Sequence, residues 1–264
     1  MALVKTEAII LRSYKSGETS KLVVLYSPSL GKMKAIAKGA RKPTSRFGAS
    51  LEPITEVSLV IYTKVDRDLQ IATQADIISP FWRVKGNVEY LTYGSAICEL
   101  TDRLTEEGDG GTSGLYSLVR GALLALDVEG VSDPEQIFWY FQLRAAEILG
   151  YRPEFERCVI CRRHVGEGNV RASVRMGGVL CRQCEGRDSQ GVRLRSGAMH
   201  FLHGLQRVAP SRVTGLSLQT HLRAEVGGFL RAFLEYHTDD RRRLKTLDFL
   251  DKMRVAEARM NYKT

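Results

Sequence analysis

Hydrophobic residues follow two different spacings along the chain, and the spacing changes near residue 80. The first 80 residues contain short runs rich in β-branched and aromatic side chains, separated by turn sequences such as SGETS and SPSLG. Runs of this kind, bounded by turn residues, predict β-strands. Five strands are expected, at residues 7–12, 21–26, 32–38, 54–63 and 69–78. Five short strands joined by turns indicate a small barrel or a meander.

Beyond Pro80 the apolar residues recur at the spacing of an amphipathic helix. Asp133 precedes a proline and is therefore the expected N-cap of one of these helices. Three helices are expected between residues 87 and 150, followed by helices at 196–208, 217–236 and 244–260.

These two patterns predict an α+β fold with two domains. The β-rich domain covers residues 1–80, and a five-stranded barrel of the OB type is the commonest way to close such a sheet without exposed edges. The α-helical domain covers 81–264 and carries a cysteine-bearing insert at about 155–190. No internal repeat and no low-complexity segment interrupts this organisation.

Four of the five cysteines form two CxxC pairs, a spacing that indicates a metal site. Cys158 and Cys161 are separated by nineteen residues from Cys181 and Cys184. This spacing is typical of a zinc site, in which two tight turns direct four thiolates at one ion. Four protein ligands leave no open position for water, so the predicted zinc ion, one per chain, is structural rather than catalytic.

Two readings compete with the four-cysteine site. Four free thiols or two disulfides would fit the same cysteines, although metal is favoured in a reducing compartment. His164 lies between the pairs and is a rival ligand, but four cysteines already satisfy the ion. The fifth cysteine, Cys98, falls within a helical apolar pattern and is expected to be a small buried residue.

The charge of the chain favours polyanionic partners. Thirty-nine Lys and Arg against thirty Asp and Glu give a formal net charge of +9, which suits nucleic acid or an anionic membrane surface. The longest apolar runs are far shorter than the twenty or so residues that span a bilayer. The N-terminus shows no signal-peptide core, so the cytoplasm is the expected compartment. DNA as a partner would associate the protein with the nucleoid.

The positive charge is concentrated between residues 19 and 50, where no acidic residue occurs. Strand alternation places Lys32, Lys34 and Lys38 on one face of their predicted strand. The loop that follows adds Arg41, Lys42 and Arg46, with Phe47 as a candidate base-stacking ring. A basic groove beside an aromatic platform is typical of proteins that bind single strands without sequence preference. A solvated lysine face, with Phe47, Tyr14 and Tyr26 in the core, is the alternative.

The chain resembles the RecO family of bacterial recombination mediators. The resemblance is carried by KTEAIILRSYKSGETSKLVVLYSPSLGKMKAIAKGARKPTSRFGASLEP at the N-terminus and by FQLRAAEILGYRPEFERCVICR with the second CxxC, as in the zinc-bearing branch of the family. It implies an OB fold, a helical domain and a zinc finger. It also implies binding of single- and double-stranded DNA, annealing of complementary strands, partnership with RecR, and loading of RecA onto strands coated by single-stranded-DNA-binding protein (SSB).

The same resemblance implies which residues contact DNA and metal. The basic positions of the barrel correspond here to Lys32, Lys34, Lys38, Arg41, Lys42 and Arg46, and the zinc ligands to the four cysteines. No motif identifies the residues that contact RecR or SSB. The acidic-apolar tail of SSB suits a basic, apolar surface in the final third of the chain, where Phe229, Phe233, Leu234 and Tyr236 accompany Arg223, Arg231 and residues 241–245. Core aromatics beside solvated arginines are an equal alternative.

Two other classes of function are less well supported. A nuclease or other nucleic-acid enzyme is disfavoured because the chain has no HExxH, no Walker-type GxxxxGK[ST] and no cluster of carboxylates at metal spacing. Asp239, Asp240 and Asp248 are expected at helix ends or on a solvent face. A transcription regulator that reads base pairs with the zinc ribbon stays open. Annealing needs no catalytic residue, only a basic surface that screens two phosphate backbones.

Overall fold

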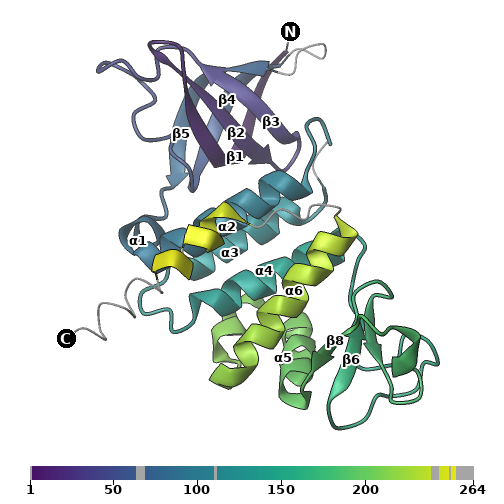
Figure 1. The fold of residues 1–264 in the computed structure, drawn as a ribbon. Coiled ribbons are helices and arrows are strands. Elements are labelled where there is room, and N and C mark those ends of the chain that lie inside the picture. Colours follow the sequence, from purple (N-terminus) through teal and green to yellow (C-terminus); the bar gives the residue numbers. More distant parts are fainter. Residues whose placement is uncertain (1, 64–68, 110–111, 239–243, 250, 254–264) are drawn as a thin grey trace. The chain divides into compact units, whose positions relative to one another are not determined.

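The computed structural model describes residues 2–63, 69–109, 112–238, 244–249 and 251–253 (Figure 1). The chain divides into two compact units. The first unit contains Met1–Gly130 together with Arg243–Thr264, and the second contains Val131–Arg242. Expectations for residues 239–243 and 254–260, including Asp239, Asp240 and the three arginines 241–243, lie outside the described residues.

The first unit begins with a closed five-stranded barrel, which confirms the predicted fold. Its strands follow the order β1-β2-β3-β5-β4 around the barrel. The strands are β1 (Ala2–Ser16), β2 (Ser20–Ser27), β3 (Gly31–Ala37), β4 (Thr55–Thr63) and β5 (Leu69–Ser79). β3 and β5 pair in parallel through four residues, 34–37 with 69–72, whereas the other neighbours are antiparallel.

Alternate side chains of the strands fill the barrel. Ala8 and Ile10 of β1, Val23 and Leu25 of β2, and Ala35 of β3 are fully buried in one cluster. Because side chains alternate between the two faces of a strand, the intervening residues point outward. This alternation is what places the lysines of β3 on the outer side of the barrel.

Three helices complete the amino-terminal part of the first unit: α1 (Trp82–Gly86), α2 (Val88–Leu104) and α3 (Leu115–Leu126). Asn87 caps α2 by accepting a hydrogen bond from the backbone N–H of Tyr90. Gly94 allows α2 to pack tightly, since a Cβ there would lie 2.8 Å from a methyl group of Val84. A short helical segment at 245–249 belongs to the same unit. The N–H groups of its first two residues donate to the carboxylate of Glu99.

The second unit is helical with a small sheet. Its helices are α4 (Pro134–Ile148), α5 (Ser196–Arg207) and α6 (Arg223–His237), with 3-10 turns η1 (Glu185–Arg187), η2 (Pro210–Gly215) and η3 (Thr220–Leu222). The sheet has the order β7-β6-β8 and is built from β6 (Val170–Ser173), β7 (Gly178–Leu180) and β8 (Val192–Leu194). Asp133 caps α4 through the N–H of Gln136, as expected.

Three features differ from the sequence expectations. β1 is fifteen residues long rather than six, because both β2 and β4 pair along it. α1 was not expected, and five residues are too few to show a helical period. The compact units also do not divide at residue 80, since α1–α3 cluster with the barrel and not with the later helices.

Candidate metal centre and nucleic-acid interface

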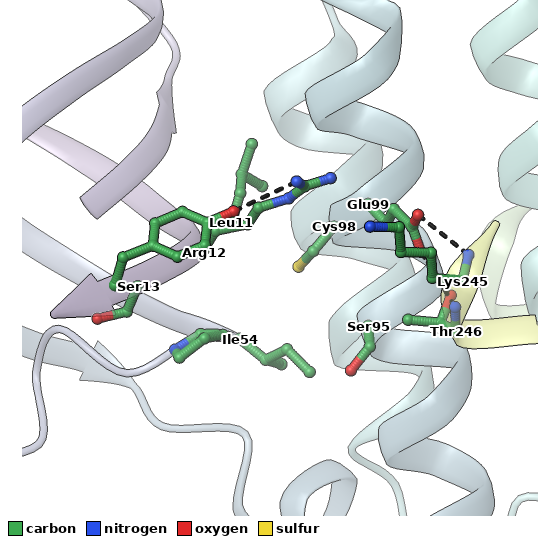
Figure 2. Close-up of a pocket in the computed structure, with 11 residues that line it drawn as sticks. Leu11, Arg12, Ser13, Ile54, Ser95, Cys98, Glu99, Lys245 and Thr246 are labelled. Atoms are coloured by element: carbon green, nitrogen blue, oxygen red, sulfur yellow. Dashed lines mark hydrogen bonds between the residues drawn. The ribbon is translucent and has the colours of Figure 1, made fainter. Parts of the chain in front are cut away.

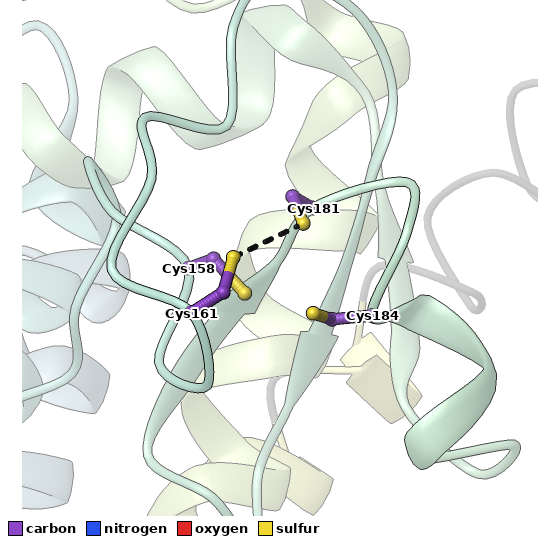
Figure 3. A group of neighbouring side chains, drawn as sticks. All are labelled: Cys158, Cys161, Cys181 and Cys184. Atoms are coloured by element: carbon purple, nitrogen blue, oxygen red, sulfur yellow. Dashed lines mark hydrogen bonds between the residues drawn. The ribbon is translucent and has the colours of Figure 1, made fainter.

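The four predicted cysteine ligands lie together in the second unit (Figure 3). Cys158, Cys161, Cys181 and Cys184 place their sulfur atoms within 4.8 Å of one another, and the Sγ atoms of Cys161 and Cys181 are 3.6 Å apart. Sulfur atoms at the corners of a tetrahedron with Zn–S bonds of about 2.3 Å lie about 3.8 Å apart. The four thiols therefore fit one tetrahedral metal ion.

Backbone hydrogen bonds shape both cysteine turns. In the first turn the N–H of Cys158 donates to the carbonyl of Arg163 and the N–H of Arg162 donates to the carbonyl of Cys158, at 2.8 and 2.9 Å. Arg162 adopts a left-handed backbone conformation with φ 61°, which reverses the chain after the second cysteine. In the second turn the N–H groups of Cys184 and Glu185 both donate to the carbonyl of Cys181.

The first turn is joined to the small sheet at Gly178. The N–H of Val179 donates to the carbonyl of Glu154, and the N–H of Val159 donates to the carbonyl of Val179. A Cβ at Gly178 would lie 2.4 Å from the backbone oxygen of Glu154, so only glycine permits this approach. The strand β7 thereby connects the segment before the first cysteine pair to the second pair.

Local hydrogen bonds favour thiolates at two of the cysteines. Burial raises the pKa of Cys158, but N–H donors of Cys161, Cys181 and Ile160 outweigh it and lower the pKa to about 6. The N–H of Arg163 lowers the pKa of Cys161. Burial and the neighbouring thiols raise the pKa of Cys184 to about 12. A cation at the centre would offset that repulsion, because metal binding deprotonates a coordinating thiol.

His164 and Cys98 do not belong to the metal-binding group of the described residues. His164 lies beside Glu156, with Nδ1 3.8 Å from a carboxylate oxygen, and its side chain is 58% exposed. Among the described residues the metal-binding group contains the four cysteines alone. Cys98 is buried in α2 of the other unit, as expected, and burial raises its pKa to about 12.

The basic strand face is partly neutralised by acids that follow much later in the sequence. The ammonium of Lys32 lies 2.8 Å from a carboxylate oxygen of Asp102 and also donates to the carbonyls of Asp102 and Thr105. Lys34 forms an ion pair with Glu107. The absence of acidic residues between 19 and 50 therefore does not leave these two lysines unpaired. Lys32 joins β3 to α2, and its side chain is only 14% exposed.

The loop after β3 presents the remaining basic residues to solvent. Lys38, Arg41, Lys42 and Arg46 are exposed, and no carboxylate in the described part of the chain pairs with them. Arg41 holds the loop against the β1–β2 turn, because its guanidinium donates to the carbonyls of Gly17 and Glu18 at 3.0 and 2.9 Å. The structure thus separates two ion-paired lysines of the strand from four basic residues of the loop.

Two of the three aromatic residues considered for base stacking lie in the core, which is the alternative stated for them. Phe47 is 4% exposed and belongs to the barrel core, so it anchors the loop and is not a free stacking ring. Tyr26 is fully buried, and its hydroxyl accepts a hydrogen bond from the N–H of Thr112. Tyr14 is 46% exposed and alone of the three offers a ring face to solvent.

The aromatic residues proposed for an SSB surface are mostly core residues. Phe229, Phe233 and Leu234 are buried in α6, and Phe229 packs edge-on against Phe155 at a centroid distance of 5.5 Å. Tyr236 is 52% exposed. Arg223 is committed to ion pairs at the start of α4, with Asp133 at 2.6 Å and with Glu135.

A pocket of about 340 Å³ that sequence reasoning missed lies in the first unit, where β1 meets α2 and the terminal helical segment (Figure 2). Leu11 and Arg12 line one side, and Lys245 and Thr246 line the other. Glu99 accepts hydrogen bonds from the N–H groups of Lys245 and Thr246 at 3.1 and 3.2 Å. No local sequence motif indicates this pocket, because its lining residues are far apart in the sequence.

Comparison with known families covers both parts of the chain. The model described as "Recombination protein O N terminal" matches residues 1–81, and the model described as "Recombination protein O C terminal" matches residues 86–247. The chain belongs to the RecO family. The junction between the two RecO models falls where hydrophobic spacing changes along the sequence.

Curated relatives with the same family name match over nearly the full length. The DNA repair protein RecO of Pelotomaculum thermopropionicum is 32% identical over 258 residues, covering 98% of this chain and 97% of the relative. That of Symbiobacterium thermophilum is 31% identical over 258 residues, covering 97% and 100%. That of Salinibacter ruber is 34% identical over 239 residues, covering 90% of each. The resemblance noted from the sequence is confirmed.

None of the helices in the described residues is both long and apolar enough to cross a membrane.

Proposed function

We propose that this chain is a DNA-binding recombination mediator that anneals complementary strands. It is a DNA repair protein of the RecO family and acts as a mediator rather than an enzyme; its relatives carry the name DNA repair protein RecO. The observation that carries the proposal is the exposed basic loop of the barrel, at Lys38, Arg41, Lys42 and Arg46, which no described carboxylate neutralises.

This loop suits a phosphate backbone better than a specific base sequence. Lysine and arginine side chains that contact phosphates release counterions, and this electrostatic contribution is independent of sequence. Annealing requires that two polyanionic strands approach each other, so a surface that screens their repulsion is sufficient and no reacting group is needed. We expect such a surface to bind both single and double strands.

The two lysines of the strand make different contributions. Lys34 is 42% exposed beside Glu107, so an incoming phosphate competes with that carboxylate. Lys32 is largely buried against Asp102, and we assign it to positioning β3 rather than to DNA contact. The proposed DNA surface therefore centres on the loop, with Lys34 at its margin.

We further propose that the four cysteines bind one zinc ion with a structural role. Four thiolates close the coordination shell, so Cys158, Cys161, Cys181 and Cys184 would hold the ion without an open position for substrate. Soft thiolate ligands in tetrahedral arrangement favour zinc over harder cations. RecR, RecA and SSB-coated strands are the partners expected of this family member, and the SSB tail requires a surface other than the buried aromatics of α6.

The experiment that tests the function mixes the purified protein with two complementary oligonucleotides coated by SSB and follows hybrid formation over time. Hybrid should form faster with the protein than without it. Replacing Lys38 and Lys42 by glutamate should slow annealing, and the matched exchange of Arg207 and Arg212, exposed residues of the second unit, gives the effect of charge alone. Strand cleavage, or annealing no faster than the spontaneous rate, would contradict the proposal.

A further inference from the structure

The cysteine insert carries its own positive surface, which consists entirely of arginine. Between residues 155 and 187 the sequence has seven arginines and no lysine. Six of these arginines are exposed: Arg157, Arg162, Arg163, Arg175, Arg182 and Arg187. The seventh, Arg171, is half-buried and donates to the carbonyls of Ser189 and Gly191.

Several arginines elsewhere in the molecule are paired with carboxylates, whereas those of the cysteine turns are not. The guanidinium of Arg12 lies 2.9 Å from Asp102, and that of Arg120 lies 2.6 Å from Glu56. Among the described residues, no carboxylate lies within ion-pair distance of Arg162, Arg182 or Arg187. An exposed guanidinium without an internal partner keeps all its donors for an external anion.

Charge balance at the metal site does not account for these arginines. Four thiolates around a divalent ion leave a net charge of −2, which attracts nearby cations. Arg163 partly neutralises that charge, because its side chain donates a hydrogen bond to the sulfur of Cys161. This contact raises the pKa of Arg163. Arg162, Arg182 and Arg187 make no such contact with the sulfurs and extend the positive surface beyond the site.

The metal site brings the two basic turns to one place. Arg162 follows the first cysteine pair directly, and Arg182 lies within the second pair. The two turns touch through the sulfurs of Cys161 and Cys181 and through a 2.6 Å hydrogen bond from Arg163 to Gln183. Figure 3 shows the four sulfurs converging from these turns. Arg162 and Arg182, twenty positions apart in the sequence, therefore lie on two turns that contact each other.

We propose that the two cysteine turns form a second phosphate-binding surface, distinct from the barrel loop, that holds a single strand of nucleic acid. The inference rests on the proposed function, since annealing requires a protein that engages two strands. Arginine suits the task because its planar fork donates two parallel hydrogen bonds to one phosphate. The barrel loop and the cysteine turns would each contact one strand.

The test measures the binding of a fluorescent oligothymidine by full-length proteins that all carry Lys38→Glu/Lys42→Glu, so that the barrel loop does not hold the strand. It compares Arg162→Gln/Arg182→Gln in that background with the protein that keeps both arginines. Removing one phosphate contact reduces the slope of log K against log[salt] by about 0.7, which corresponds to about fivefold in affinity at 0.1 M salt. The double variant should therefore bind about 25-fold more weakly, with a slope smaller by about 1.4. Arg207→Gln/Arg212→Gln, with the same charge change on α5 and η2, should stay within about twofold.

Metal content is measured for every variant, so that disruption of the metal site is not mistaken for removal of a phosphate-binding side chain. If the double variant loses metal, Arg187→Gln, which lies beyond the second cysteine pair, replaces it and should bind about fivefold more weakly. Equal affinity of the metal-loaded insert variant and the control pair would overturn the second surface while leaving the proposed function intact. A parent protein that does not bind the oligonucleotide would overturn both.

Discussion

The barrel loop and the cysteine insert both expose positive charge, but they hold it in place by different means. The first 80 residues carry eight lysines and four arginines, whereas the segment 155–187 carries arginine alone. The loop is anchored by an apolar side chain, because Phe47 is buried in the barrel core. The two cysteine turns, at 158–163 and 181–185, contain no aromatic residue, and four sulfurs meet there instead.

This difference teaches how short segments become ordered. A loop next to a barrel can bury an aromatic side chain in the barrel core, as Phe47 does, while Arg41 adds hydrogen bonds to the β1–β2 turn. Segments as small as the cysteine turns bury too little apolar surface to be stable alone and need a metal or a disulfide. The two surfaces should therefore respond differently when the metal or the core is disturbed, and this response can be measured.

Removing the metal should have the largest effect, and it should be confined to the insert. Structural zinc contributes an apparent 10–16 kcal/mol or so to folding of small domains, so Cys158→Ser/Cys181→Ser should unfold residues 155–187. Hydrogen exchange should show loss of protection there and unchanged protection in β1–β5. Elemental analysis should find one zinc per parent chain and none in the variant.

Cys98→Ala is the matched control for this experiment, because Cys98 is buried in α2 and lies outside the metal group. That variant should retain the metal in full. If the barrel lost protection together with the insert, the two regions would not be anchored independently, and the comparison between them would fail.

Disturbing the barrel core should destabilise the barrel and leave the cysteine insert unchanged. Phe47→Ala removes a buried aromatic side chain and should lower the free energy of unfolding by about 3–5 kcal/mol, as measured by urea denaturation of the barrel. Metal content should not change. Tyr14→Ala, at an exposed aromatic of the same barrel, should change stability by about 0.5 kcal/mol or less. A cost for Phe47→Ala no greater than that for Tyr14→Ala would mean that Phe47 does not anchor the loop.

The cysteine site could be predicted from the sequence because its determinants are local. Each CxxC specifies a turn whatever the surroundings, and Cys161 and Cys184 are where the spacing placed them. The barrel was predictable for a similar reason, since alternation along β3 separates Ala35 and Ala37 from the lysines. Patterns that repeat within one element can be read without knowing its neighbours.

The partners of the basic residues could not be predicted, because they lie far away in the sequence. Lys32 meets Asp102 seventy positions later, and α1 is capped by Asp127, whose carboxylate accepts from the N–H groups of Arg83 and Val84. The role of Phe47 stayed open for the same reason. Its place next to Arg46 was compatible with an exposed ring or with a core residue, and only the folded barrel shows that it packs in the core.

Variants of Lys32 and Lys42 distinguish a residue that positions β3 from a residue that binds DNA. Lys32→Gln breaks a charge-assisted contact with Asp102 at a side chain that is 14% exposed, so the free energy of unfolding should fall by about 2 kcal/mol. Its affinity for single strands should stay within about twofold. Lys42→Gln should behave in reverse, with stability changed by about 0.5 kcal/mol or less and affinity about fivefold weaker at 0.1 M salt. Denaturation and anisotropy titrations of the same preparations measure both. Equal loss of affinity in the two variants would place Lys32 in the DNA surface.

The smallest expected effect is that of replacing lysine by arginine in the barrel loop, and the reverse exchange in the cysteine turns is its counterpart. Lys38→Arg/Lys42→Arg in the barrel loop should change affinity by less than about twofold, because a mobile ammonium acts there as a point charge. Arg162→Lys/Arg182→Lys in the cysteine turns keeps the charge but loses the bidentate fork, and binding should weaken by about threefold to tenfold, the worth of one or two ordinary hydrogen bonds. Salt slopes should stay at the parent value in both cases, since the number of charges is unchanged. If the insert exchange were as neutral as the barrel exchange, the arginines of the cysteine turns would contribute charge alone, and their geometry would have no part in binding.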